Sequence, residues 1–316
     1  MQTKDFGEVK RYLQDYKKSP NNYSAYTYSE NLVDSYYAIC LQFQSVDKFD
    51  SIQNLKSNFY SVNILTNQYK ILHYNIKDFG LVKFNKAQID INQINSLKQI
   101  EYKHPYLEIF AGVRQSELEY WNGLDQVQPL LHLMFPWIAD TPVRNRGTIC
   151  GSIAHADPSA ELVLALTVLE GSVVLVSKKK KRIVSASDFF LGALQTDRQS
   201  NEFIQSVIFP SKIKNAGYGF AEYGYRHGDF AVVAVAAIRD GDNWSIGFGG
   251  IDDVAKLYKT VAKSAKEAAQ FIDQLASDIE VREDPTATSG LRRHLMRSLG
   301  EKACMQADQL FKGESK

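Results

Sequence analysis

The spacing of apolar and polar residues changes along the chain and predicts strands and helices in alternation over its first half. Residues 30–42 carry apolar side chains at helical spacing, whereas residues 61–65 and 88–91 are short β-type runs. Residues 107–112 predict a further strand, and an apolar stretch over 129–139 predicts a helix. Alternation of this kind indicates an α/β arrangement for this part of the chain.

A strongly apolar segment begins at Glu161 and predicts a helix that ends at Gly171, the residue type expected just past a helix C-terminus. From Ser172 onward the pattern of apolar and polar residues has a period of two residues. The alternation predicts short strands at 173–176, 183–184 and 202–210. The basic run between the first two of these strands is predicted to be a solvated hairpin tip whose lysines discourage edge pairing.

The C-terminal third has a different pattern, and a boundary is predicted near residues 211–216. Residues 230–238 and 244–251 read as two strands of a hairpin. Apolar residues then recur at helical spacing over 254–272 and again over 291–299. We therefore predict a small antiparallel sheet backed by helices, an α+β domain.

Composition and charge exclude several classes of function. The chain has 316 residues, and 37 Lys plus Arg against 36 Asp plus Glu leave a net charge of +1, which favours neither nucleic acid nor anionic membranes. The three cysteines, Cys40, Cys150 and Cys304, are far apart, so an iron–sulfur cluster or structural zinc site in this chain is not expected. No apolar run reaches the roughly 18 residues of a membrane span, and no signal peptide is visible, so we expect a cytoplasmic protein.

One stretch, RNRGTICGSIAHADPSAE at 144–161, gathers features suited to a ligand with two phosphates. It combines two arginines, the Thr148 hydroxyl, a small-residue step at Gly151 and Ser152, and the start of a helix at Glu161. A glycine-containing loop between two ordinary helices would have the same composition. Composition alone leaves these two interpretations open.

Other chemistries find little support in the sequence. Ser152, His155 and Asp157 lie within six residues of one another, whereas a hydrolytic triad draws its members from separate elements. The six histidines lack metal-binding spacings such as H-E-x-x-H. We therefore predict no catalytic side chain and no metal site in this chain.

Three segments together resemble one family. They are RNRGTICGSIAHADPSAEL, then VVLVS with RIVSASDFFLGALQT and EFIQSVIFP, and finally GFAEYGYRHGDFAVVAVAAI. The sequence resembles the FAD-binding medium subunit of the molybdenum hydroxylases, the group of carbon monoxide dehydrogenase and xanthine dehydrogenase. The resemblance is good from about residue 88 to 300 and weak before that.

The resemblance implies a domain layout and an α+β fold class. A polar extension, residues 1–24, precedes a PCMH-type FAD-binding domain over 25–212, whose two subdomains span about 25–87 and 88–212. Residues 213–316 form the C-terminal domain of the medium subunit, the antiparallel sheet backed by helices predicted above.

The resemblance also implies the residues that bind FAD in two loops and at one acid. The second loop corresponds to Thr148, Ile149, Cys150, Gly151 and Ser152, whose backbone amides would hold the pyrophosphate. The acid corresponds to Glu161, and Asp157 also fits the family pattern. The first loop is matched by Thr66, Asn67 and Gln68. Here the sequence departs from the family, because this loop has no glycine, and Cys150 stands where glycine is common.

The function implied is that of an electron-transfer subunit. In the family, a large subunit carries the molybdenum–pterin cofactor and a small subunit carries two [2Fe–2S] clusters, expected here as a dimer of heterotrimers. The small subunit passes electrons to the FAD of the medium subunit, which gives them to an external acceptor. Two alternatives stay open: an FAD-free structural or assembly subunit, motivated by the glycine-free first loop, and a stand-alone flavin oxidase.

Overall fold

The computed structural model describes residues 70–71, 89–92, 94–178 and 180–314. The chain divides into two units, residues 1–90 and 91–316. In the first unit, β1 (Lys70–Ile71) and β2 (Ile89–Asp90) pair antiparallel. The helix predicted over 30–42 and the strand predicted over 61–65 lie outside the described residues.

The second unit contains a five-stranded sheet in the order β3-β4-β9-β5-β6, antiparallel throughout. Its central strands are buried because they carry continuous apolar runs, as in Val173, Val174 and Leu175 of β5. The strands are β3 (Ile100–Lys103), β4 (Tyr106–Phe110), β5 (Ser172–Val176), β6 (Lys181–Ser185) and β9 (Phe203–Pro210).

Short helices connect and cover these strands. The apolar segment predicted to be a helix forms α8 (Glu161–Val168), and its chain reversal uses Glu170 at φ 51° rather than Gly171. Gly171 is needed for packing, since a Cβ there would lie 2.6 Å from the Ile208 carbonyl oxygen. The other elements are η4 (Asn95–Leu97), α3 (Gln115–Glu119), α4 (Leu124–Val127), α5 (Pro129–Met134), η5 (Phe135–Trp137), α6 (Thr141–Arg144), α7 (Ile149–His155), α9 (Ala186–Phe189), β7 (Phe190–Gly192) and β8 (Gln195–Thr196).

The C-terminal part is a four-stranded antiparallel sheet, in the order β10-β11-β12-β13, followed by two helices. The elements are β10 (Gly217–Tyr223), β11 (Val233–Asp240), β12 (Asn243–Gly249), β13 (Lys256–Val261), α10 (Ala265–Asp278) and α11 (Ser289–Glu314). The α+β fold class is thereby confirmed.

The helix predicted from residue 254 was wrong over its first part, because residues 256–261 form β13. This strand pairs along β12, and the helix begins only after Ser264, whose hydroxyl accepts a hydrogen bond from the Glu267 N–H. Cross-strand pairing therefore overrides the helical spacing of Leu257 and Val261.

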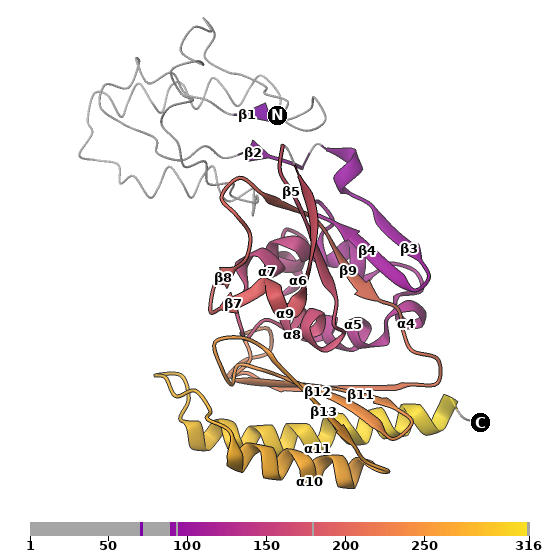
Figure 1. Ribbon diagram of the computed structural model, residues 1–316, viewed down its shortest axis with the longest axis vertical. Coiled ribbons are helices and arrows are strands. Elements are labelled where there is room, and N and C mark those ends of the chain that lie inside the picture. The colour runs from indigo at the N-terminus through magenta and orange to yellow at the C-terminus, as the bar shows by residue number, and fades with distance from the viewer. Residues whose placement is uncertain (1–69, 72–88, 93, 179, 315–316) are drawn as a thin grey trace, which may run out of the picture. The chain divides into compact units, whose positions relative to one another are not determined.

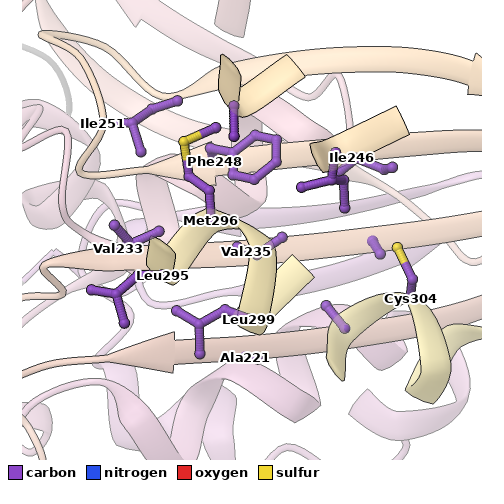
Figure 2. Packing of buried hydrophobic residues seen from close by; sticks show 14 of the residues in the cluster. Ala221, Val233, Val235, Ile246, Phe248, Ile251, Leu295, Met296, Leu299 and Cys304 are labelled. Atoms are coloured by element: carbon purple, nitrogen blue, oxygen red, sulfur yellow. The ribbon is translucent and has the colours of Figure 1, made fainter. Parts of the chain in front are cut away.

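The C-terminal sheet has helices on both faces (Figure 1). On one face Ala221, Val235 and Phe248 pack against α11, where Figure 2 shows Met296, Leu299 and Cys304. The opposite face packs against α8. There a Cβ at Gly247 would lie 1.9 Å from Val168 Cγ2. Small residues on this face thus allow α8 and the C-terminal sheet to approach closely.

Candidate FAD-binding site

Thr148 is held at the junction between an extended segment and a helix. It forms an isolated antiparallel bridge with Arg114. The Gln115 N–H donates to the Gly147 carbonyl at 2.9 Å, and the Ile149 N–H donates to the Val113 carbonyl at 3.3 Å. This ladder sets the direction in which α7 begins.

Thr148 also caps α7. Its backbone is extended (φ −108°, ψ 155°), and its Oγ1 accepts a hydrogen bond from the Gly151 N–H at 2.9 Å. Gly151 is required for this cap, because a Cβ at residue 151 would lie 2.7 Å from the same Oγ1. The predicted Thr–Gly pair is therefore one capping unit.

One side of α7 is buried and apolar. Ile149, Cys150 and Ile153 are fully buried, and the Cys150 thiol donates to the Ile109 carbonyl at 3.6 Å. Burial raises the pKa of Cys150 above its ordinary value, so the thiol stays protonated. Cys150 lies inside the helix, and its φ is not positive, so the position does not require glycine.

Most backbone N–H groups at the start of α7 already donate hydrogen bonds within the protein. The Ile149, Gly151 and Ser152 N–H groups have acceptors within the protein. Among the described residues, no acceptor is found for the Cys150 N–H, and the Ser152 side chain is only partly buried. Cys150 is fully buried, however, so of these groups the Ser152 side chain is the donor that the start of α7 presents to a ligand.

Asp157 builds the turn between α7 and α8. Its Oδ1 accepts the Ser159 N–H at 2.8 Å, and its carbonyl accepts the Ala160 N–H at 3.0 Å. This role is structural, and it presents Glu161 in the first turn of α8.

Glu161 is a buried acid, only 5% exposed. Burial is the main cause that raises its pKa to about 7, and the charge of Asp157 acts in the same direction. Its own backbone N–H at the helix start opposes this shift. A buried carboxylate placed here is suited to accept hydrogen bonds from ligand hydroxyls.

The two arginines of the stretch differ in their surroundings. Arg144 is buried, pairs with Glu119 at 2.8 Å, and donates to the Ile138 and Ala139 carbonyls at 2.7 and 2.8 Å. It therefore holds α6 in place, as its contacts with α3 and with the chain before α6 show. Arg146 is exposed, and its carbonyl accepts a hydrogen bond from Arg114.

Two features near the loop were missed from sequence. The Leu194 N–H donates to the Ala156 carbonyl at 3.1 Å, which joins the β7–β8 hairpin to the end of α7, and the Leu194 side chain is 58% exposed at φ 57°. Glu222 of β10 is buried, and its Oε2 has no hydrogen-bond partner. A large apolar residue in a tight turn was a signal for Leu194, whereas nothing in the sequence marks Glu222 as buried.

The residues of the second loop therefore suit the phosphate and hydroxyl groups of a nucleotide ligand. Thr66, Asn67 and Gln68, the predicted first loop, lie outside the described residues. Within the described ranges no group of three or more His, Cys, Asp or Glu could hold a metal ion. No helix in that part of the chain is long and apolar enough to cross a membrane.

Comparison with known proteins gives a domain match in the first two thirds of the chain. Residues 62–212 match the family described as "FAD binding domain in molybdopterin dehydrogenase". Just under half of the chain is thus similar to this FAD binding domain. This confirms the resemblance, and FAD is the cofactor of the matched domain. Thr148 through Glu161 lie inside the match.

Curated relatives belong to several dehydrogenases. Caffeine dehydrogenase subunit beta of Pseudomonas sp. (strain CBB1) is 30% identical over 164 residues, 52% of this chain and 56% of the relative. The carbon monoxide dehydrogenase medium chain of Hydrogenophaga pseudoflava is 31% identical over 150 residues, 48% and 52% of the two chains. The chain thus spans about half the length of these relatives. The glyceraldehyde dehydrogenase medium chain of Sulfolobus acidocaldarius is 28% identical over 229 residues, 68% and 80% of the two chains.

Solved structures share the fold. Quinoline 2-oxidoreductase from Pseudomonas putida 86 superposes with a TM-score of 0.64 at 27% identity, covering 70% of this chain and 81% of that chain. Carbon monoxide dehydrogenase from Hydrogenophaga pseudoflava superposes with a TM-score of 0.62 at 25% identity and the same coverage.

Proposed function

We propose that this chain carries FAD and transfers electrons within a heteromeric molybdenum hydroxylase. The observation that carries the proposal is the match of residues 62–212 to an FAD binding domain, inside which Thr148, Ser152 and Glu161 form a capped helix start beside a buried acid. The relatives named above, a subunit beta and two medium chains of dehydrogenases, support the assignment to a multi-subunit oxidoreductase.

The residues of the second loop would bind the cofactor through its polar groups. The Ser152 hydroxyl would donate to the pyrophosphate, and Glu161 would accept from hydroxyls of the ribose or ribityl chain. When bound, FAD supplies the redox chemistry, because its isoalloxazine takes up and releases electrons. Thr66, Asn67 and Gln68 would contact FAD from the first loop. No side chain of this chain is assigned acid–base catalysis.

Substrate chemistry would belong to partner subunits. A large subunit would carry the molybdenum–pterin cofactor, and a small subunit would carry the [2Fe–2S] clusters that reduce the FAD of this chain. The three would assemble as a dimer of heterotrimers, and FAD would reduce an external acceptor. The absence of clustered cysteines from the sequence agrees with this division of labour.

Flavin content tests the proposal. The purified full chain is expected to show the visible flavin band at one FAD per chain. Replacing Thr148 by Val removes the cap at constant shape and is expected to raise the FAD dissociation constant about tenfold, which corresponds to about 1.4 kcal/mol. Thr148→Ser keeps the hydroxyl and serves as the matched control.

The alternatives give different results in the same preparation. If the chain binds no FAD even at saturating concentration, it would be the FAD-free structural or assembly subunit, the alternative suggested by the absence of glycine from the first loop. A flavin that is reduced by an organic substrate without cluster-bearing and molybdenum-bearing partners would indicate a stand-alone oxidase. Co-purification with such partners supports the proposed complex.

A further inference from the structure

Glu222 lies on the face of the C-terminal sheet that is turned toward the candidate FAD site. It pairs with Ala234, which pairs in turn with Gly249. Residues paired across antiparallel strands project from the same face of a sheet. At Gly249 this face meets the turn before α8, because a Cβ there would lie 3.2 Å from the Pro158 carbonyl oxygen.

The turn that carries Glu161 is joined to the same sheet. The Gly250 N–H donates to the Pro158 carbonyl at 2.9 Å, and Leu164 of α8 lies against Gly247 and Gly249. Glu161 therefore begins the helix that covers the face from which Glu222 projects (Figure 1). Two acids from distant parts of the sequence face one buried layer.

Neither acid is neutralised by a cation in the contacts of the described residues. Glu222 is 7% exposed, and its buried Oε2 has no hydrogen-bond partner. A lone buried acceptor of this kind costs about 1–3 kcal/mol when it stays unpaired, and more when it is charged. Burial disfavours the charged form of each acid, and the charge of Glu161 further disfavours ionisation of Glu222.

The local structure decides which acid keeps the charge. Glu161 occupies the first turn of α8, where the backbone N–H groups and the positive end of the helix dipole stabilise a carboxylate. Glu222 lies on a strand without such a field. In agreement, burial and then the charge of Glu161 raise the pKa of Glu222 to about 9, against about 7 for Glu161.

We propose that Glu222 is a positioning residue for FAD binding: as a neutral acid, it leaves the negative charge of the buried pair on Glu161, the group that accepts hydrogen bonds from FAD. This inference rests on the proposed function. The carboxylate of Glu161 can then accept hydrogen bonds from ligand hydroxyls. Because Glu222 stays neutral, it adds no second negative charge that would repel the FAD pyrophosphate.

The buried Arg239 of β11 pairs with Asp308 of α11 on the opposite face of the sheet, and the other titratable groups around Glu222 are more exposed. His132 of α5 and Arg226, His227 and Asp229 of the loop after β10 are exposed, so solvent and salt screen their charges. Asp157 is partly buried and acts on Glu161. The buried charge balance therefore depends on Glu161, Glu222 and Asp157.

The test is the pH profile of FAD affinity in the full chain, freed of flavin and titrated with FAD from pH 6 to 9.5. Above the pKa of Glu222 the dissociation constant is expected to rise, by at most about tenfold per pH unit, because one proton is lost from the binding form. Glu222→Gln mimics the neutral acid, so it is expected to keep the affinity at pH 8 within about twofold and to abolish this rise. Glu301→Gln, at an exposed acid on α11, is the control and keeps the original profile.

A purely structural role for Glu222 would lower stability without changing the pH profile. The proposal is overturned if the alkaline rise is absent or survives in Glu222→Gln. Infrared spectroscopy of the unaltered chain at pH 8 gives a second measurement that needs neither folding of the variant nor bound FAD. A protonated buried carboxyl band supports the proposal, and its absence overturns it. Failure to bind FAD at every pH overturns the proposed function instead.

Discussion

Cys150 lies directly beneath the candidate FAD loop, where its thiol is buried and donates to the Ile109 carbonyl. We predict that iodoacetamide does not alkylate Cys150 in the native chain, because burial both blocks access and disfavours the thiolate. Cys304, whose pKa burial raises to about 12, is expected to be equally inert. Mass spectrometry of the two peptides checks this, and labelling in urea serves as the control. Alkylation of Cys150 in the native chain would contradict the burial assigned to the thiol.

Because the pKa of Glu222 is raised in the folded chain, we predict that the stability of the chain depends on pH. Its pKa is raised from 4.5 in the unfolded chain to about 9, so the folded state holds one more proton between these values. The free energy of unfolding therefore falls as pH rises through this window, by at most about 1.4 kcal/mol per pH unit. Urea unfolding at pH 6 and 8.5 should show a shallower decline in Glu222→Gln than in the original chain. An equal decline in both proteins would contradict the assigned protonation.

The sequence predicted individual site residues where local chemistry was sufficient. The local structure of Thr148, Gly151 and Glu161 followed from sequence because a cap, a small residue and a helix-opening acid are neighbours along the chain, whereas their roles in binding FAD stay predictions. The burial of Arg144 could not be predicted from sequence, because its partner Glu119 lies on another helix. Glu222 could not be found, because its burial results from pairing across the sheet. The roles predicted for Thr66, Asn67 and Gln68 stay predictions.

At the scale of elements, the contact between β10 and α11 depends on glycine. A Cβ at Gly219 would lie 1.9 Å from the Ala303 carbonyl oxygen, a backbone atom that cannot rotate away. Gly219→Ala is therefore expected to lower the free energy of unfolding by on the order of 1–3 kcal/mol. Gly290→Ala is the matched control: it is exposed on α11 and should stabilise the helix by up to about 1 kcal/mol. Denaturant unfolding measures both changes, and an undiminished stability in Gly219→Ala would contradict the close packing.

Element types followed from sequence where a continuous apolar run was bounded by a glycine or a proline, as in α8 before Gly171 and in β9 up to Pro210. The period misled at residues 254–261, where a strand at the sheet edge has apolar positions that also fit a helix. Strand β10 went unrecognised because its glycines, Gly217 and Gly219, weaken the apolar pattern. Those glycines are required by α11, more than 80 residues further along the chain, so a local window cannot explain them.

At the scale of the molecule, α8 connects the FAD-binding half with the C-terminal sheet. Nearly every residue of this helix is buried, so it lacks a polar face. The apolar run could be seen in the sequence, but the sequence did not explain why every side of the helix is apolar. On one side α8 contacts the helices α5, α7 and α9, which accompany the five-stranded sheet. On the other side it contacts β11 and β12 of the C-terminal sheet (Figure 1). The boundary predicted near residues 211–216 thus marks a change of sheet within one compact unit.

This arrangement predicts that the FAD-binding half is not stable alone. A chain ending at residue 212 would expose Leu164 and Val168, which contact the C-terminal sheet at Gly247. Each fully buried side chain of this kind contributes about 1.5–3 kcal/mol, so we expect a lower unfolding temperature, binding of a hydrophobic dye and aggregation. Val168→Lys provides the control, because it should reduce dye binding in the short chain and destabilise the full chain. A short chain that stays monomeric and unfolds at the temperature of the full chain would show that α8 does not depend on the sheet.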